Sequence, residues 1–488
     1  MKKIFCLTLA ILLLLGMTAC GSSNQKSDNP ESTKNATEPQ ETQPAAPQLE
    51  VGYGKVNITP TYSVGLGGSG NDKTRRSTGL ISYVYAICLA FRQNGELYLV
   101  YTIDTLSVND ELADLCRERI IEKIPEVKPE HIYLMATHGH SCPTPYWPDE
   151  NEGKYRKEFF DWMPQAATLA IKDLAPVTDM QVARFDLEGM SFVRHYLMND
   201  GTYAGSNFGS TVSGYKAHTY EVAKEMILVN FPREGKDDVL LVNWAAHPAN
   251  PYDEAIGYLN ISADHPGWCR DKLEQLIGNT KVAYFNGASG DVVPNSQIKE
   301  INHGLNAKEY GERLAEMAYE HYGELKSAEI TDIKTVNRDV KVKVDHEYED
   351  VPGMLEACAE IRQMYMYRGQ KTEADQWAYR LGLTSCYVAS TIYNRNKLGE
   401  YDIRELNAMS IGPVGIVTCT FEMASEHAME LKAIAPFEYV VIMSGNQRYI
   451  PREEAIDYHS YEGDTRYYVR ETGDEMVQHF NDLLNEVK

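Results

Sequence analysis

The stretch YLMATHGHSCPTPYW, residues 133–147, is the best starting point for interpreting the chain. Its apolar first half is typical of a buried strand, and the prolines and small polar residues of its second half indicate a loop. Two of the 13 histidines of the chain, His138 and His140, follow the apolar run. If the strand continues through them, its period of two points both imidazoles to one side. Such a pair is a common start to a metal site, but a His-x-His pair is more often a surface or hydrogen-bonded pair.

Two further polar side chains stand at the ends of apolar runs. His247 ends the run LVNWAAHPAN, residues 241–250, and Glu422 follows VGIVTCTF and opens a predicted helix. Each has a structural alternative. His247 could be a half-buried histidine with satisfied hydrogen bonds, and Glu422 could stabilise the helix dipole.

The rest of the pattern alternates strands and helices. Asn94 and Gly95 separate two β-branched and aromatic runs, which predicts a hairpin, and Asn109 is placed to cap the next helix. Residues 352–400 have a mainly helical pattern, and no internal repeat is visible. This alternation predicts an α/β fold: a layered domain with a mixed β-sheet and flanking helices. Polar residues at strand ends lie where open α/β sheets usually place their sites.

Composition limits the possible partners. The formal net charge is −23, and 43% of the residues are hydrophobic, which is enough for a substantial core. There is no basic stripe to neutralise phosphates, so nucleic acid is not expected as a partner. Non-specific adhesion to anionic lipid is not expected either.

The N-terminus predicts export. Residues 1–20 have two lysines, a short apolar segment and small residues before Cys20, which is typical of a bacterial lipoprotein signal. An ordinary secretory signal with an incidental cysteine is the alternative. Residues 21–48 are polar and predict a disordered linker, so residues 49–488 are expected to be a single catalytic domain. The protein is thus predicted to be extracytoplasmic and anchored to the bacterial cell membrane through a lipid on Cys20.

The remaining cysteines do not indicate a disulfide framework. Nine cysteines less Cys6 and Cys20 leave an odd number, with no CxxC pair, so neither disulfides nor a thiolate zinc site is expected. We expect buried, small apolar side chains.

Several motifs, taken in order, resemble one family. They are ATHGHS, NWAAHP, GASGDVVPN, FEMAS and RYIPREEAIDYHSYEG, with GYGKVNITPTYSVGLGGSG at the start. Together they resemble the zinc-bearing N-terminal catalytic domain of the neutral/alkaline non-lysosomal ceramidase family, from about residue 50 to about residue 465.

The resemblance implies a Zn²⁺ site and assigns residues to it. The implied zinc ligands are the side chains of His138, His247, Glu422 and Tyr449. Imidazole nitrogens and hard oxygen ligands suit Zn²⁺, which lowers the pKa of a bound water to about 7.

Three further residues are implied to act beside the metal. His140 would move a proton between water and the leaving amine, and Arg194 and Tyr461 would stabilise the oxyanion as it forms. The implied substrate is a small molecule or lipid with an N-acyl group, such as N-acyl-sphingosine.

The chain departs from the family in three places. The serine that the family has three residues before the Gly290-Asp291 pair is replaced by Gly287, and Ser289 is offset by two positions. The family's glycine-rich continuation after His140 is SCPTPYW here. Few residues follow the Tyr461 motif, so the family's immunoglobulin-like domain is not expected.

The sequence therefore predicts a zinc-dependent, ceramidase-like amide hydrolase. Two alternatives stay open: a non-catalytic surface-binding lipoprotein that keeps the fold, and a serine hydrolase that uses Ser289.

Overall fold

The computed structural model describes residues 48–68, 75–146, 150–205, 214–249, 259–348, 350–445 and 448–488. These residues belong to one compact unit, residues 46–488. The predicted signal and all but the last residue of the predicted linker lie outside the described residues, so both stay predictions. No helix in the described ranges combines the length and the apolar character needed to cross a membrane.

Three mixed sheets contain most of the strands. The first has the order β5-β4-β3-β1-β6 and consists of β1 (Glu50–Asn57), β3 (Tyr85–Gln93), β4 (Glu96–Ile103), β5 (Ile132–Ala136) and β6 (Ala175–Pro176). The second has the order β15-β13-β12-β7-β17 and consists of β7 (Met180–Asp186), β12 (Glu225–Phe231), β13 (Asp238–Trp244), β15 (Thr280–Asn286) and β17 (Lys326–Ala328). The third has the order β18-β19-β20-β22 and consists of β18 (Lys334–Lys343), β19 (Tyr401–Ile411), β20 (Val414–Cys419) and β22 (Tyr439–Ser444).

The three sheets share one connectivity. In each, three antiparallel strands are followed by a helix and then by a fourth strand that runs parallel to the third. A parallel pair needs such a crossover. The crossover helices are α1 (Asp110–Lys123), α3 (Asp264–Ile277) and α8 (Ser425–Ile434). The repetition is one of topology, although no repeat is visible in the sequence.

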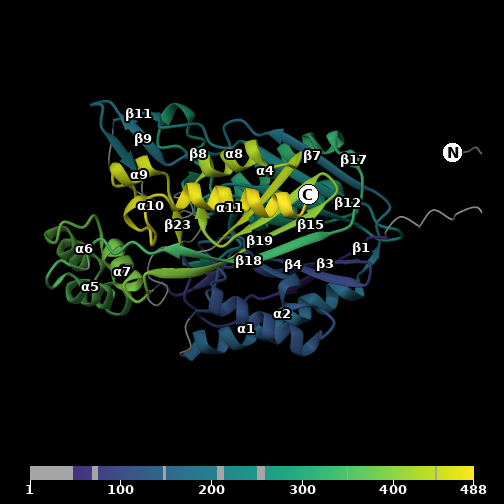
Figure 1. Ribbon diagram of the computed structural model, residues 1–488, viewed down its shortest axis with the longest axis horizontal. Helices are drawn as coiled ribbons and strands as arrows, with labels where there is room; N and C mark the ends of the chain where they lie inside the picture. Colours follow the sequence, from purple (N-terminus) through teal and green to yellow (C-terminus); the bar gives the residue numbers. More distant parts are fainter. Residues whose placement is uncertain are drawn as a thin grey trace, which may run out of the picture. The chain divides into compact units, whose positions relative to one another are not determined.

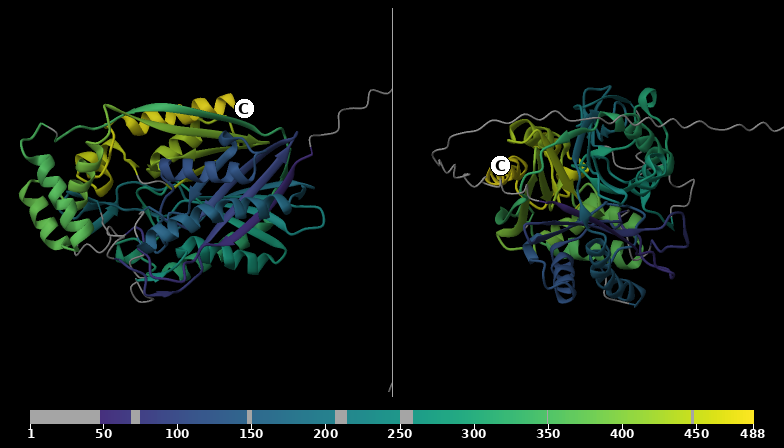
Figure 2. Two further views of the ribbon diagram at one scale, coloured as in Figure 1. Left: turned by 90° about the horizontal axis from the view of Figure 1, so that it is seen from below. Right: turned by 90° about the vertical axis from the view of Figure 1, so that its right-hand side faces the viewer.

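Each sheet is buried on both faces. The inner faces of all three meet in one apolar core, which includes Val51, Val229 and Val441. The outer faces carry helix pairs, formed by the crossover helices together with α2 (Glu150–Lys172), α4 (Ala307–Glu320) and α11 (Thr472–Glu486). Figure 2 shows the three parts, purple to blue, teal, and green to yellow. Burial on two faces explains the nearly continuous apolar runs of β5 and β20.

Long insertions leave the sheets at one end. In each sheet, the first and third strands flank one antiparallel strand and therefore run in the same direction. These pairs are β1 and β4, β7 and β13, and β18 and β20, and the two strands of each pair have their carboxyl ends at the same end of the sheet. The insertion after β7 contains β8 (Phe192–Val193), β9 (His195–Met198), β10 (Tyr203–Gly205) and β11 (Tyr215–His218). The insertion after β18 contains α5 (Met354–Arg368), α6 (Lys371–Arg380) and α7 (Cys386–Arg395), which confirms the helical prediction for this region. Both insertions lie on the left of Figure 1.

Short elements complete this end of the sheets. They are β2 (Gly79–Leu80), β14 (Asn260–Ile261), β16 (Val292–Val293), β21 (Glu422–Met423), β23 (Tyr449–Ile450), α9 (Glu453–Asp457) and α10 (Tyr461–Asp464). Most of them pair across distant parts of the chain, as β8 does with β16 and β21 with β23.

Local sequence signals were confirmed. Asn94 and Gly95 both have positive φ, 53° and 82°, between the paired strands β3 and β4, as a primed hairpin turn requires. Asn109 caps α1 by accepting a hydrogen bond from the backbone N–H of Leu112. The seven cysteines of the described residues are free and buried, and burial raises the pKa of Cys88 and Cys116.

Candidate metal centre

His138 and His140 lie in a turn and not on a strand. β5 ends at Ala136, and the backbone N–H of Gly139 donates to the carbonyl of Thr105 at 3.1 Å. His138 has a φ of 66°, an uncommon and strained conformation for a residue other than glycine. The strand therefore does not continue through the two histidines, and strand alternation does not apply to them. The turn brings them together instead, with ring centroids 5.2 Å apart.

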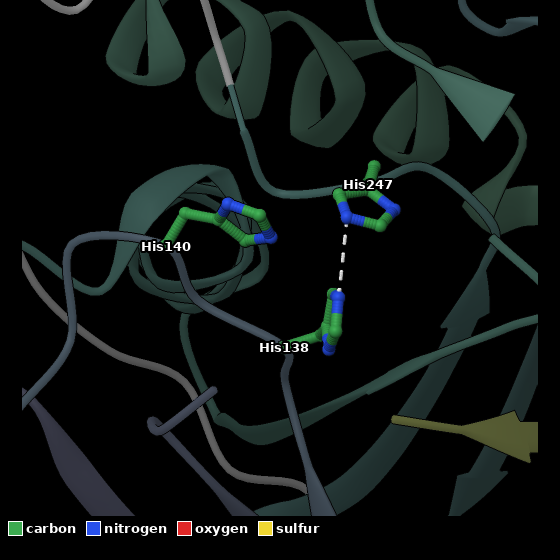
Figure 3. Close-up of side chains that lie close together, drawn as sticks. All are labelled: His138, His140 and His247. Atoms are coloured by element: carbon green, nitrogen blue, oxygen red, sulfur yellow. Dashed lines mark hydrogen bonds between the residues drawn. The ribbon is translucent and has the colours of Figure 1, made fainter. Parts of the chain in front are cut away.

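The imidazoles of His138 and His247 face each other through their Nε2 atoms. These atoms are 3.2 Å apart (Figure 3). On the other side of each ring, Nδ1 of His138 lies 2.8 Å from the carbonyl oxygen of Leu106, and Nδ1 of His247 lies 3.0 Å from that of Ser289. A carbonyl only accepts hydrogen bonds, so both Nδ1 atoms carry the proton. With Nδ1 occupied on both rings, the Nε2 atoms are the ones left to bind a metal, and both face the same small volume.

The carboxylate of Glu422 completes this group. Oε2 of Glu422 lies 3.3 Å from Nε2 of His138 and 4.0 Å from Nε2 of His247. It is buried and accepts no hydrogen bond from the described residues. The prediction that Glu422 opens a helix was wrong, because it lies in β21, which pairs in parallel with β23, and the helix begins only at Ser425.

These three atoms fit a divalent cation. Two lone pairs and a carboxylate oxygen repel one another unless a positive charge lies between them. Tetrahedral zinc with bonds of 2.0–2.1 Å separates its ligands by about 3.3 Å. Two of the three separations, 3.2 and 3.3 Å, match this value, and the third is 4.0 Å. Metal-bound histidines typically donate their second ring proton to a carbonyl, as His138 and His247 do here.

Tyr449 stands beside Glu422. The two residues are directly paired between β21 and β23, and Nη2 of Arg194 donates to the Tyr449 hydroxyl at 3.4 Å. Burial, and then the charge of Glu422, raises the pKa of Tyr449 well above its ordinary value. The structure thus brings all four of the predicted ligands to one place, from the ends of β5, β13, β20 and β22.

His140 belongs to the same group of imidazoles. One ring nitrogen from each of His138, His140 and His247 lies within 4.8 Å of the others. Burial, followed by the charges of His138 and Arg75, lowers the pKa of His140 well below its ordinary value. Three imidazoles are thus close enough to share one ion, so the division between a ligand His138 and a proton-transferring His140 stays a prediction.

Arg194 and Tyr461 also lie at the site. The guanidinium of Arg194 is 5.8 Å from the ring centroids of both Tyr449 and Tyr461. Burial by itself lowers the pKa of Arg194, but the nearby carboxylate of Glu462 outweighs it and the guanidinium stays charged. Burial raises the pKa of the Tyr461 phenol, so this phenol keeps its proton.

Two buried residues of the site were not identified from the sequence. They are Glu462 and His195, and both side chains are almost fully buried. Glu462 accepts hydrogen bonds from Arg194 and from His195. Burial raises the pKa of Glu462, but Arg194 and His195 prevail and lower it to about 2. The only available signal for Glu462 was its place directly after Tyr461 in the matched motif.

The glycine-rich turn after β15 holds these parts together. Gly290 donates its N–H to the carbonyl of Met423 at 2.9 Å, and a side chain there would collide with the β21 backbone. The Ser289 hydroxyl lies 3.0 Å from Nδ2 of Asn286, while His247 contacts the Ser289 carbonyl. This geometry gives no support to Ser289 as a nucleophile, because the nearby imidazole faces its backbone. At Gly287, an added Cβ would lie 3.0 Å from Cβ of Ala245, so this position is tightly packed.

A narrow gap lies beside the predicted ligands and is lined in part by His195, Gly290, Glu422, Tyr449 and Glu462. It has no room for a water-sized molecule as the side chains stand. The site therefore combines side chains that could hold a metal, a buried guanidinium and two protonated phenols. This arrangement is suited to polarising and hydrolysing a carbonyl compound.

The fold and site together define a three-sheet α/β domain with a histidine–carboxylate centre at the strand ends. Comparison with solved structures shows that this is the fold of neutral ceramidases. The neutral ceramidase from Pseudomonas aeruginosa superimposes with a TM-score of 0.66 and 15% sequence identity, over 90% of this chain and 74% of that one. A ceramidase complexed with C2 gives a TM-score of 0.66 at 16% sequence identity, over 90% of this chain and 75% of that one. The fold implied by the sequence motifs is thus confirmed. No family model matches the chain, and no curated protein matches it significantly.

Proposed function

We propose that the protein is a zinc-dependent hydrolase that cleaves the amide bond of an N-acyl lipid of the ceramide type. The observation that carries this proposal is the convergence of two Nε2 lone pairs and an orphaned carboxylate oxygen within 4.0 Å of one another. The ceramidase fold supports the same conclusion, and one of the structures with this fold is complexed with C2.

His138, His247, Glu422 and Tyr449 would hold the ion. When bound, zinc supplies a water of lowered pKa and a Lewis acid for the substrate carbonyl. The carbonyls of Leu106 and Ser289 keep both imidazoles in the tautomer that offers Nε2. The charge of Glu422 lowers the net positive charge of the loaded site.

The side chains around this centre then perform the acyl transfer to water. His140 lies close enough to both other imidazoles to take a proton from the attacking water and to pass it to the departing amine nitrogen. Arg194 and Tyr461 offer a guanidinium and a phenolic O–H to the carbonyl oxygen as it becomes negative. Their burial strengthens this stabilisation, because the surrounding dielectric constant is low.

The test is turnover with and without a chelator, on the soluble chain that lacks residues 1–48. We expect release of fatty acid from at least one N-acyl-sphingosine or related amide, loss of turnover with chelator, and recovery with added zinc. A panel of esters on the same preparation separates amide from ester preference. Chelator-resistant turnover together with fluorophosphonate labelling of Ser289 would instead establish the serine hydrolase.

One observation favours a second candidate, a non-catalytic surface-binding lipoprotein. The family's serine is Gly287 in this chain, and Ala245 fills the space beside it. This candidate predicts stoichiometric zinc and lipid binding but no turnover of any substrate in the panel.

Anchoring at the outer face of the cell membrane through a lipid on Cys20 is part of the proposal and is supported by the sequence alone. Cell fractionation tests it. We expect the full chain in the membrane fraction and a Cys20→Ser variant outside that fraction, and equal distribution of the two would contradict the anchor.

A further inference from the structure

We propose that Glu462 is a positioning residue that, together with His195, holds the Arg194 guanidinium against the Tyr449 phenol. This inference deepens the proposed function and rests on it, because Arg194 is the group expected to meet the developing oxyanion. Glu462 itself need not contact substrate to act in this way.

The carboxylate of Glu462 has one donor for each of its oxygens. Oε1 accepts from Nε of Arg194, and Oε2 accepts from Nε2 of His195 at 2.8 Å. The side chains of Glu462, Arg194 and His195 are 2%, 1% and 1% exposed. A buried pair of this kind has a fixed geometry, because neither partner can exchange its hydrogen bonds for water.

His195 is oriented in turn by Tyr458. The Tyr458 hydroxyl lies 2.8 Å from Nδ1 of His195. Nε2 of His195 is directed at the Glu462 carboxylate, so Nδ1 is the ring atom that meets the Tyr458 hydroxyl. The segment that contains α9 and α10 therefore supplies Tyr458 and Glu462, which bracket His195 from both sides.

The opposite edge of the guanidinium is directed at the site. Nη2 of Arg194 donates to the carbonyl of Gly290 at 2.7 Å and to the Tyr449 hydroxyl at 3.4 Å. Glu422 also attracts this cation from nearby, and contributes to raising its pKa. Without the charge of Glu462, the strongest remaining carboxylate for Arg194 is Glu422, which faces the metal site. Glu462 thus keeps the guanidinium beside the Tyr449 hydroxyl and away from the Glu422 carboxylate.

The experiment uses the zinc-loaded soluble chain and a double-mutant cycle. We expect Glu462→Gln to lower kcat by about 10–100-fold with little change in KM, the loss found when a residue that supports a site is removed. In an Arg194→Met background, the same change should alter kcat by less than about 2-fold, because Glu462 acts through Arg194. Equal losses in both backgrounds, or no loss in either, would overturn the inference.

Two further variants separate positioning from stability. Tyr458→Phe removes only the hydroxyl behind His195, so we expect a smaller loss of kcat in the same direction, which keeps the inference testable if Glu462→Gln folds poorly. The matched control is Asp173→Asn. It breaks an ion pair away from the site, in which Nη1 of Arg233 lies 2.6 Å from Oδ2 of Asp173. It should lower Tm but leave kcat unchanged. A loss of kcat in this control would show that general destabilisation is sufficient.

A crystal structure of Glu462→Gln gives a readout that does not depend on activity. We expect the Arg194 guanidinium to leave the Tyr449 hydroxyl and approach Glu422. An unmoved guanidinium would overturn the inference even if kcat falls. If the wild-type chain turns over nothing, the proposed function fails, and the position of Arg194 in this variant still decides the inference.

Discussion

Among the residues that the structure describes, two groups of side chains have the composition of a metal site. One is His138, His140 and His247, with Glu422 beside them, and the other is His427, Glu430 and Asp474. In the first group, all three imidazoles are buried. Nδ1 of His138 and Nδ1 of His247 each form a hydrogen bond to a backbone carbonyl. In the second, the two acids are exposed, and Nε2 of the buried His427 lies 3.5 Å from a carboxylate oxygen of Asp474.

The difference lies in the atom on the far side of each ring. Nδ1 of His427 is buried and has no hydrogen-bond partner among the described residues. Binding a metal through Nε2 would place a proton on this Nδ1 with no acceptor, at a cost of about 1–3 kcal/mol. His138 and His247 have no such cost, because backbone carbonyls accept their Nδ1 protons. Proximity of ligand types therefore does not define a metal site, whereas orientation by the surrounding backbone does.

The largest effect is expected when a ring of the first group is removed. His247→Ala should lose stoichiometric zinc and turnover together, because the remaining side chains no longer surround the ion. Elemental analysis and an activity assay on the same preparation measure both. A His247→Ala chain with full zinc content would contradict the assignment.

His140 distinguishes a ligand from a proton carrier within the first group. His140→Gln should keep zinc and lower kcat by about 10²–10⁴-fold, the usual contribution of general acid–base catalysis. If zinc is lost as well, His140 is a ligand and the division of roles is wrong.

Removing the metal should lower the thermal stability of the protein. Free zinc at 1,000 times its Kd stabilises the fold by about 4 kcal/mol, so chelation should lower Tm. The His138→Ala variant is the matched control, and its Tm should respond little to chelator. Equal shifts in both proteins would place the stabilising ion elsewhere.

The smallest effect on zinc content is expected when a residue of the second group is substituted. His427→Ala should leave zinc content and kcat unchanged. Its Tm should fall, because a ring that is 3% exposed leaves a cavity when it is removed. A loss of zinc in this variant would remove the distinction between the two groups.

The sequence revealed those parts of the site that depend on local pattern. The hairpin at Asn94–Gly95 and the strand ends before His138 and His247 follow from turn chemistry and apolar runs. The helix expected from Glu422 begins only at Ser425, because Glu422 and Met423 pair with β23, and a local sequence pattern does not reveal such a distant pairing partner.

The remaining features depend on tertiary structure. The Leu106 and Ser289 carbonyls orient the imidazoles through backbone atoms, which leave no mark on residue type. Glu462 meets Arg194 across 268 residues of chain. The shared connectivity of the three sheets is likewise invisible in the sequence, because similar topologies need only similar patterns of burial.

Anomalous diffraction at the zinc absorption edge, on crystals of the zinc-loaded soluble chain, would locate the ion itself. We expect one strong peak about 2.0–2.2 Å from Nε2 of His138, Nε2 of His247 and Oε2 of Glu422, and none beside His427. A peak at His427, or no peak between the two facing imidazoles, would contradict the proposed zinc site.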